Sequence, residues 1–528
     1  MIGMTGKLTR RALLAQIGTV AGSAVMYQAM TSLGIAQESP YKGPPKLEGD
    51  VAGTTVLILG AGLAGMTAAL ELSAAGYQVV VLEYREQAGG RNWTLRGGDT
   101  YTELGGYTQK VGFSEGNYLN PGPWRIPYHH HGVLDYCRRL NVALEPFIQV
   151  NHNAFLHSIK AFGGKPQRYR HIATDFRGGV SELLAKVVNQ KQLDDQVTVE
   201  EKEILLEALR SYGVLDENFA YKAGAHVSEY RGWARDPGGG LSGKPEPSEP
   251  LPFREVVSSR LWRSLSVGDN YEFQMPMFQP VGGMDMIGKA LEREVGKLIT
   301  YNAKVISIRQ DEQGVTATFA DREKPGEAQT TSAQYCICTI PFSILGQIDH
   351  NFSRPVTDVI NAMYYEGSVK FGLQMKRRFW EEDEHIFGGI SYTDLPISLI
   401  SYPQSDFFKP GPAVLLGGYS WDTFAYEFNS LSPEERVKKA VEFGRLIHPQ
   451  YEAEFDNGIA VSWHRVPWVL GCFGIWRDRE GQYDIAARGD GRTYFAGEHI
   501  SSIPAWQEGA ILSALDTISR LHDRVIKS

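Results

Sequence analysis

Cysteine is scarce in this sequence, and basic residues are not in excess. The 528 residues include four cysteines, at positions 137, 336, 338 and 472. No Cys-x-x-Cys pair occurs, so a disulfide scaffold and a cysteine-based zinc site are both excluded. Lysine and arginine total 53 against 61 aspartates and glutamates, which gives a formal charge of -8. A chain without a basic excess is not expected to bind nucleic acid.

Long hydrophobic runs are also missing, while the overall composition is that of a folded protein. Hydrophobic residues make up 42% of the chain and charged residues 22%. This balance excludes a disordered chain, a collagen-like chain and a polytopic membrane protein. A length of 528 residues predicts two to four globular domains with a sizeable buried core.

The amino terminus carries a pair of arginines, Arg10-Arg11, directly before a weakly apolar stretch that runs to about Ala36. Glycine, alanine and two glutamines dilute this stretch, which makes it a poor spanning helix. The pattern resembles a twin-arginine export signal, with small residues for a signal peptidase at 34–36. Residues 1–36 are therefore predicted to direct export to the periplasm or the medium, and 37–53 to form a linker. A retained anchor or an ordinary amphipathic helix is the alternative.

The first strong element of the sequence is followed by a glycine-rich turn. Residues 54–59 are continuously β-branched and aliphatic, which predicts a strand buried on both faces. Residues 60–65 read Gly-Ala-Gly-Leu-Ala-Gly, and a helix-forming run at 66–75 and a second buried strand at 78–82 follow before Glu83. The glycines let backbone N–H groups approach a pyrophosphate, and a carboxylate after the second strand can bind ribose. The segment predicts dinucleotide binding.

Three further segments favour a flavin over a nicotinamide. Gly89-Gly90-Arg91 places an arginine where it can neutralise the pyrophosphate, and residues 103–106 add a glycine pair that a flat ring system could approach. Near the carboxyl terminus, a short strand at 494–496 ends in Gly497-Glu498 and precedes a predicted helix at 505–521. A nicotinamide dehydrogenase does not need a contribution so far along the chain, whereas a long flavin dinucleotide does.

On these motifs, residues 54–521 resemble the flavin-containing amine oxidase superfamily, and within it the L-amino acid oxidase branch. The resemblance implies a mixed α/β fold. A Rossmann-like FAD-binding domain of the glutathione-reductase type would interleave with a mixed-sheet substrate domain and carry a helical insertion. The implied boundaries are 54–112, 277–350 and 485–528 for the FAD-binding domain, 113–170 and 351–484 for the substrate-binding domain, and 171–276 for the helical domain.

The resemblance also implies how FAD is bound. Residues 279–284 resemble the entry to the second FAD-binding segment, and in 302–305 the backbone of Val305 would contact adenine. Family members with covalent flavin carry a cysteine before the final helix, but 501–504 read Ser-Ser-Ile-Pro, so noncovalent FAD is expected. The expected FAD contacts are Gly60, Gly62, Leu63, Ala64, Gly65, Glu83, Tyr84, Gly90, Arg91, Gly122, Pro123, Trp124, Arg125, Val305, Trp463, Gly497, Glu498, Trp506, Gln507 and Ala510.

Lys370 lies in an apolar run, 367–371, that resembles the strand bringing a lysine to flavin N5. An unpaired buried ammonium is costly, so a lysine in such a strand is expected to have a function. In the family this lysine holds a water against N5 and aids either amine oxidation or flavin re-oxidation. A lysine on an exposed strand face is the alternative.

Residues 120–127, Asn-Pro-Gly-Pro-Trp-Arg-Ile-Pro, resemble the segment of L-amino acid oxidases whose arginine binds the substrate carboxylate. Arg125 would offer that carboxylate two parallel donors. The tyrosine of Ser401-Tyr402-Pro403 resembles one that adds a hydroxyl to the same carboxylate. Trp506 resembles the aromatic wall beside the flavin, and Ala505 would offer its carbonyl to the α-amino group. The expected catalytic residues are Lys370, Arg125, Tyr402 and Trp506, and those expected to bind substrate are Arg125, Tyr402, Ala505 and Trp506.

Two histidine patterns limit what the resemblance can assign. Some L-amino acid oxidases place a histidine over the substrate from their helical domain, whereas 255–275 contain none, and the side-chain preference stays open. His129-His130-His131 are interpreted as a polar helix start, because neighbours on a regular element point in different directions. No metal site is predicted.

The resemblance implies oxidative deamination of L-amino acids. The clamped substrate would pass a hydride from Cα to flavin N5, and the products would be a 2-oxo acid, ammonia and hydrogen peroxide. Expected partners are an L-amino acid and oxygen, with no nucleic acid and no stable membrane partner beyond the export machinery; a homodimer or higher homo-oligomer is expected. An amino-acid 2-monooxygenase or a monoamine or polyamine oxidase is the alternative enzyme, and a flavin-binding redox sensor the non-enzyme alternative.

Overall fold

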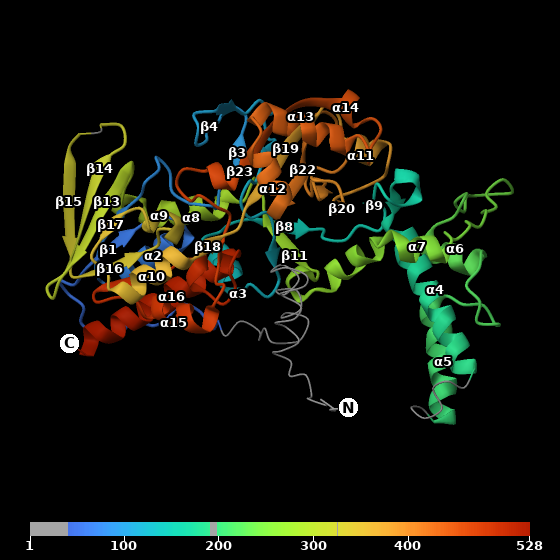
Figure 1. The fold of residues 1–528 in the computed structure, drawn as a ribbon, viewed down its shortest axis with the longest axis horizontal. Coiled ribbons are helices and arrows are strands. Elements are labelled where there is room, and N and C mark those ends of the chain that lie inside the picture. The colour runs from blue at the N-terminus through green and yellow to red at the C-terminus, as the bar shows by residue number, and fades with distance from the viewer. Residues whose placement is uncertain (1–40, 191–197, 325, 528) are drawn as a thin grey trace, which may run out of the picture.

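The computed structural model describes residues 41–190, 198–324 and 326–527. Figure 1 shows a main body of sheets and helices, with strands β13–β15 at one end and helices α4–α7 projecting from the other. The predicted export signal at 1–36 lies outside the described residues. Within them, no helix combines the length and the apolar character needed to cross a membrane.

A parallel five-stranded sheet in the order β12-β2-β1-β16-β25 forms the centre of the first domain. The predicted strand–turn–helix–strand is present as β1, α2 and β2, which confirms the Rossmann-like start. The bounds are β1 Thr55–Leu59, α2 Leu63–Ala74, β2 Gln78–Leu82, β12 Ile299–Thr300, β16 Tyr335–Cys338 and β25 Thr493–Phe495.

Opposite faces of this sheet are covered by different layers. One face packs against α2, α3 (His131–Arg139), α8 (Asp285–Val295) and α16 (Gln507–Lys527). The other face, which includes Cys336 and Cys338, packs against a second sheet of β13 (Ala303–Gln310), β14 (Val315–Asp321), β15 (Ala328–Ala333) and β17 (Asp349–His350). The two cysteines share one core face, because they alternate with Ile337 along β16.

The second domain is built on a mixed seven-stranded sheet in the order β10-β9-β20-β21-β22-β19-β23. Its strand β19 is buried at every position and pairs antiparallel with both β22 and β23. Helices α12 (Asp422–Asn429) and α13 (Pro433–Gly444) cover this sheet. The strand bounds are β9 Phe155–His157, β10 Gln167–Arg168, β19 Ser368–Met375, β20 Ile390–Thr393, β21 Leu399–Ser401, β22 Ala413–Trp421 and β23 Phe455–Ser462.

The predicted helical domain is helical in its described part. It begins at Tyr169, two residues before the expected boundary of 171, and ends in two 3-10 turns at Leu261–Asp269 and Tyr271–Phe273. A buried ion pair between Arg231 and Asp175, at 2.9 Å, joins two of its helices. Its helices are α4 Tyr169–Asn189, α5 Val199–Gly213, α6 Ala225–Arg231 and α7 Phe253–Ser259.

Short elements connect these domains. They are β3 Leu95–Arg96, β4 Thr100–Thr102, β5 Thr108–Lys110, β6 Tyr118–Leu119, β7 Ile126–Pro127, β8 Leu144–Phe147, β11 Met277–Pro280, α9 Phe342–Leu345, α10 Arg354–Ala362, β18 Tyr364–Tyr365, α11 Phe379–Glu382, α14 Tyr451–Glu454, β24 Gly474–Ile475 and α15 Arg479–Arg488. The small sheet β7-β11-β8 lies where the chain passes between the first two domains, and Arg125 directly precedes β7.

Candidate active site

A cavity of about 750 Å³ begins at the carboxyl ends of β1 and β2 and reaches the residues of β19 and β22 that face the first domain. This is the edge at which open α/β sheets bind ligands, and the volume is typical of a cofactor site. Every predicted FAD contact except Gly65 lines this cavity, and so do Ala505 and Lys370. The structure therefore brings together residues from both ends of the chain.

Gly65 does not line the cavity. A Cβ atom on Gly65 would lie 1.9 Å from the carbonyl oxygen of Gly60, so glycine is needed here to let α2 pack closely against the turn. Gly90 meets a similar constraint, because its Cβ would lie 3.2 Å from Cα of Gly62. The expected FAD contact at Gly65 is therefore corrected to a packing role.

The carboxylate of Glu83 is fixed at one end of the cavity. One of its oxygens accepts a hydrogen bond from the N–H of Ala61 at 2.7 Å, and the other accepts from the N–H of Arg85 at 2.8 Å. Burial raises the pKa of Glu83, and these two amides oppose that rise. Each oxygen keeps acceptor capacity, so the ribose of a dinucleotide could bind here.

Arg91 and Glu498 join distant parts of the chain beside the cavity. Their side chains form an ion pair at 2.6 Å, and Arg91 also donates to the carbonyl of Cys472 at 2.9 Å. The second oxygen of Glu498 accepts from the N–H of Ala505 at 3.0 Å. The turn after β2 is thus tied to the segment that precedes α16.

Lys370 projects from β19 into the other end of the cavity and is 1% exposed. Its Nζ donates to the carbonyls of Gly122 and Asn120, the latter at 3.4 Å. The ammonium also lies over the rings of Trp124 and Tyr419, at 4.4 and 4.3 Å. Burial lowers the pKa of Lys370 to about 7, so this lysine can exchange a proton near neutral pH.

Arg125 lines the same end of the cavity without an ion-pair partner among the described residues. Its Nη1 donates to Oε1 of Gln149 at 2.7 Å, and its guanidinium packs between the rings of Trp124 and Phe273, at 4.9 and 4.2 Å. Burial lowers the pKa of Arg125 to about 10, and the nearby Tyr392, Tyr419 and Glu272 oppose this effect only in part. The arrangement leaves a positive charge ready for an anionic ligand.

Tyr402 does not reach the cavity, contrary to its expected place beside the substrate. It is 1% exposed, and its hydroxyl is hydrogen-bonded to Ser391 Oγ and His448 Nε2, both at 2.7 Å. Its side chain therefore belongs to the core of the seven-stranded sheet. Tyr392, on β20, is the tyrosine connected to Arg125, because its hydroxyl accepts from Gln149 Nε2 at 3.0 Å.

A model of the flavin containing amine oxidoreductase family matches residues 63–520. The chain belongs to this family. It is an oxidoreductase with FAD as its cofactor, and the glycine turn, Glu83 and the cavity that ends at Lys370 fit that group. When bound, FAD supplies a two-electron acceptor.

Several known proteins are similar to this oxidoreductase over most of their own length. YobN of Bacillus subtilis is 29% identical over 476 residues, which covers 87% of this chain and 93% of the relative. An L-amino-acid oxidase of Siganus canaliculatus is 26% identical, covering 89% of this chain and 86% of its own. An L-amino-acid oxidase of Pseudechis australis is 28% identical, and the match covers 87% of this chain and 85% of that relative.

The solved structures confirm the fold of the oxidoreductase. Wild-type putrescine oxidase bound to putrescine aligns with a TM-score of 0.56 and 16% sequence identity. The alignment covers 90% of this chain and 99% of that one. At this identity the likeness concerns the fold alone, which is the mixed α/β architecture predicted from the sequence.

Aromatic side chains enclose the Arg125 end of the oxidoreductase's cavity. Trp506 lies between Phe273, with ring centres 6.1 Å apart, and His130, at 4.9 Å. Tyr419 and Trp421 line the cavity from β22, where alternate residues share a face. Sequence reasoning predicted Trp506 but missed the others, although the spacing of 419 and 421 in a neighbouring apolar run is a signal that could have found them.

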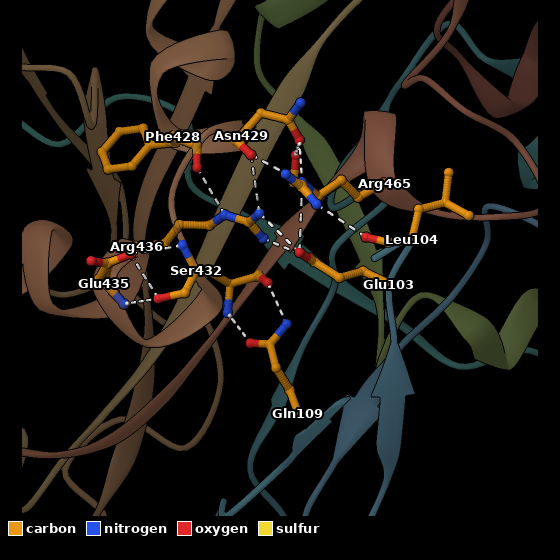
Figure 2. A network of polar contacts seen from close by, with 11 residues as sticks. Glu103, Leu104, Gln109, Phe428, Asn429, Ser432, Glu435, Arg436 and Arg465 are labelled. Atoms are coloured by element: carbon orange, nitrogen blue, oxygen red, sulfur yellow. Dashed lines mark hydrogen bonds and ion pairs between the residues drawn. The ribbon is translucent and has the colours of Figure 1, made fainter. Parts of the chain in front are cut away.

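A buried network fixes the loop that follows β4, as Figure 2 shows. Glu103 pairs with Arg436 of α13 at 2.6 Å, and both side chains are 0% exposed. The backbone N–H of Leu104 donates to the carbonyl of Arg465 at 2.8 Å. The loop is thereby held so that Leu104 lines the cavity. A buried pair of this kind is costly to break, because either partner alone is an uncompensated charge.

The histidine run behaves differently from its prediction. His131, the first residue of α3, is exposed, whereas His129 and His130 are both buried and both contact Glu272. The two neighbouring side chains reach the same carboxylate oxygen of Glu272. The prediction concerned histidines on a regular element, whereas His130 is the residue before the helix and has a nonhelical backbone (φ -80°, ψ 69°).

Proposed function

We propose that this oxidoreductase is an L-amino acid oxidase. The observation that carries the proposal is Arg125, a cation that lines the cavity beside Lys370 and forms no ion pair with the described carboxylates. A substrate carboxylate would satisfy this charge, whereas a simple amine would leave it unpaired. The names of the relatives from Siganus canaliculatus and Pseudechis australis support the same substrate class.

In the proposed reaction the chain orients the substrate and controls protons. Arg125 binds the carboxylate with two parallel donors, while Gln149 and Phe273 hold the guanidinium in place. Trp506 and Tyr419 limit the access of water to the reacting carbon. Overall, amino acid, water and oxygen become 2-oxo acid, ammonia and hydrogen peroxide.

Lys370 is proposed to act on a proton or a water molecule at its Nζ atom. With a pKa of about 7, its side chain is present as both ammonium and amine at neutral pH. Trp124, Tyr419 and two backbone carbonyls fix the position of Nζ beside the cavity. In the place expected for Tyr402, we propose that Tyr392 supports the carboxylate clamp through Gln149.

An amino-acid panel tests the proposal. Purified protein should release peroxide and ammonia from L-amino acids and yield the 2-oxo acid. The D-enantiomer and the decarboxylated amine of the best substrate should react far more slowly. Recovery of the amide would instead indicate an amino-acid 2-monooxygenase, and preference for the amine would indicate a monoamine or polyamine oxidase. No flavin bleaching by any amino acid or amine without oxygen would favour a redox sensor.

The mode of FAD attachment, the export and the oligomeric state are further proposals. Ser501 donates to the carbonyl of Glu498 at 2.6 Å and offers no thiol for a flavin bond, so acid should release free FAD. Replacing Arg10 and Arg11 by lysine should retain the protein in the cytoplasm if residues 1–36 form a twin-arginine signal. Light scattering of the purified protein tests the proposed homodimer or higher homo-oligomer.

A further inference from the structure

Three side chains that can bind a metal, His129, His130 and Glu272, lie close together, and the ring of His130 packs against Trp506. Nε2 of His129 and Nε2 of His130 lie 3.3 and 3.2 Å from the same carboxylate oxygen of Glu272. The nearest ligand atoms of the three residues all lie within 4.8 Å of one another. The side chains are 7%, 2% and 2% exposed, so water does not surround the group.

The group contains a buried carboxylate. The side chain of Glu272 is 2% exposed, and no lysine or arginine of the described residues forms an ion pair with it. A buried carboxylate of this kind is stabilised by a cation.

The two contacts of Glu272 have a spacing that fits two ligands of one ion better than two strong hydrogen bonds. Hydrogen bonds between a charged donor and a carboxylate are typically about 2.7–2.9 Å long, shorter than both contacts of Glu272. Two ligands each about 2.05 Å from one zinc ion at the tetrahedral angle lie about 3.3 Å apart. The two contacts of Glu272, at 3.3 and 3.2 Å, match this distance between two zinc ligands.

We propose that His129, His130 and Glu272 bind a divalent transition metal of the zinc class. Two imidazoles and one carboxylate are a ligand set that zinc accepts, whereas magnesium and calcium prefer oxygen ligands throughout. Three protein ligands leave the fourth position of a tetrahedron to water. The site is separate from the FAD cavity, since none of the three residues lines it.

The ligands come from two domains, so a bound ion would connect them. His129 and His130 precede α3, whose first amides donate to Glu508 of α16. Glu272 lies in the last turn of the helical domain, directly before Phe273, which contacts Arg125. Zinc would thus fasten the helical domain to α3, which packs against the five-stranded sheet, next to the proposed substrate clamp, and would stabilise the folded chain.

Metal content and thermal unfolding test the site on the FAD-loaded protein. After dialysis against a chelator, titration with zinc chloride should give one tight site per chain, confirmed by elemental analysis, and should raise Tm by several degrees. Glu272→Gln is the decisive variant, because the amide oxygen can still accept both histidine hydrogen bonds but is a poor zinc ligand. His130→Ala should also lose the site.

His131→Ala is the matched control, since it removes the exposed histidine of the same run. It should bind zinc like the wild type. The proposal is overturned if the wild type binds no zinc, if Glu272→Gln retains the stoichiometric site with the same rise in Tm, or if His131→Ala loses it. Zinc-free Tm and flavin absorbance show which variants are folded. Because metal content is measured without turnover, these results are independent of the proposed oxidase activity.

Discussion

Replacing Gln149 by glutamate would place a carboxylate beside Arg125, the residue proposed to bind the substrate carboxylate. Oε1 of Gln149 lies 2.7 Å from Nη1 of Arg125, so Gln149→Glu would form an internal ion pair with the clamp. The side chain is 0% exposed and cannot turn into solvent. A substrate carboxylate bound to the same guanidinium would then lie about 4 Å from a like charge, which costs about 4 kcal/mol at an effective dielectric constant of 20.

This energy corresponds to a loss of about three powers of ten in kcat/KM for an amino acid. The decarboxylated amine has no like charge to bring near the new carboxylate, so its kcat/KM should stay within a few-fold of wild type. Gln149→Met is the matched control: it is of similar length and uncharged, and loses one hydrogen bond to a charged group, worth about 1.5 kcal/mol or tenfold.

Steady-state peroxide formation with an amino acid and with its amine measures both effects. The reasoning is refuted if Gln149→Glu and Gln149→Met lower amino-acid turnover equally, or if the amine is affected as strongly as the amino acid. Either result would mean that Arg125 does not bind the substrate carboxylate.

Four further predictions address other residues. Arg125→Ala should raise KM for amino acids by at least two powers of ten, with a much smaller effect on amines, because a charge-assisted bidentate pair is lost. The pH profile of turnover should contain an ionisation near pH 7, because Lys370 is an ammonium below this pH and an amine above it. The variant Lys370→Met should lack this ionisation. Stopped-flow traces of flavin reduction and flavin re-oxidation should show which of these two half-reactions the variant slows. Tyr392→Phe should raise KM several-fold, whereas Tyr402→Phe should lower Tm and leave KM unchanged, since its hydroxyl bonds only in the core. Glu103→Gln should destabilise the fold by about 3 kcal/mol or more, read from urea unfolding, because it leaves the Arg436 charge buried and uncompensated.

Local sequence patterns predicted the parts of the site that depend on backbone conformation and on strand placement. The glycine turn between β1 and α2 has its own signature, because close approach of chain to chain requires glycine at Gly60 and Gly65. Lys370 was placed correctly on a buried strand, since a lysine in a wholly apolar run is costly to bury unless its charge is used. These inferences needed only neighbouring residues.

Local sequence could not predict toward which face of a sheet a side chain points. It also could not predict contacts between side chains from distant segments. Tyr392 and Tyr402 lie on or beside adjacent strands, and both occur in apolar surroundings, so local sequence offers no reason to choose between them. Gln149 is recognised as a clamp residue only through its contacts with Arg125 and Tyr392, which lie in separate segments. His129 and His130 meet Glu272 because the chain between them folds into the whole helical domain, which no local pattern reports.

The ion pair between Arg91 and Glu498 has a consequence for biosynthesis. Because Arg91 emerges from the ribosome 407 residues before Glu498, the wall of the cavity that includes Trp506 and Gln507 is absent while the intervening chain is made. Strand β25 and helix α16 must be released before the parallel sheet gains its last strand. Enclosure of FAD is therefore expected only after β25 and α16 have been made, and a ribosome stalled before codon 493 holds a chain that cannot yet enclose the cofactor.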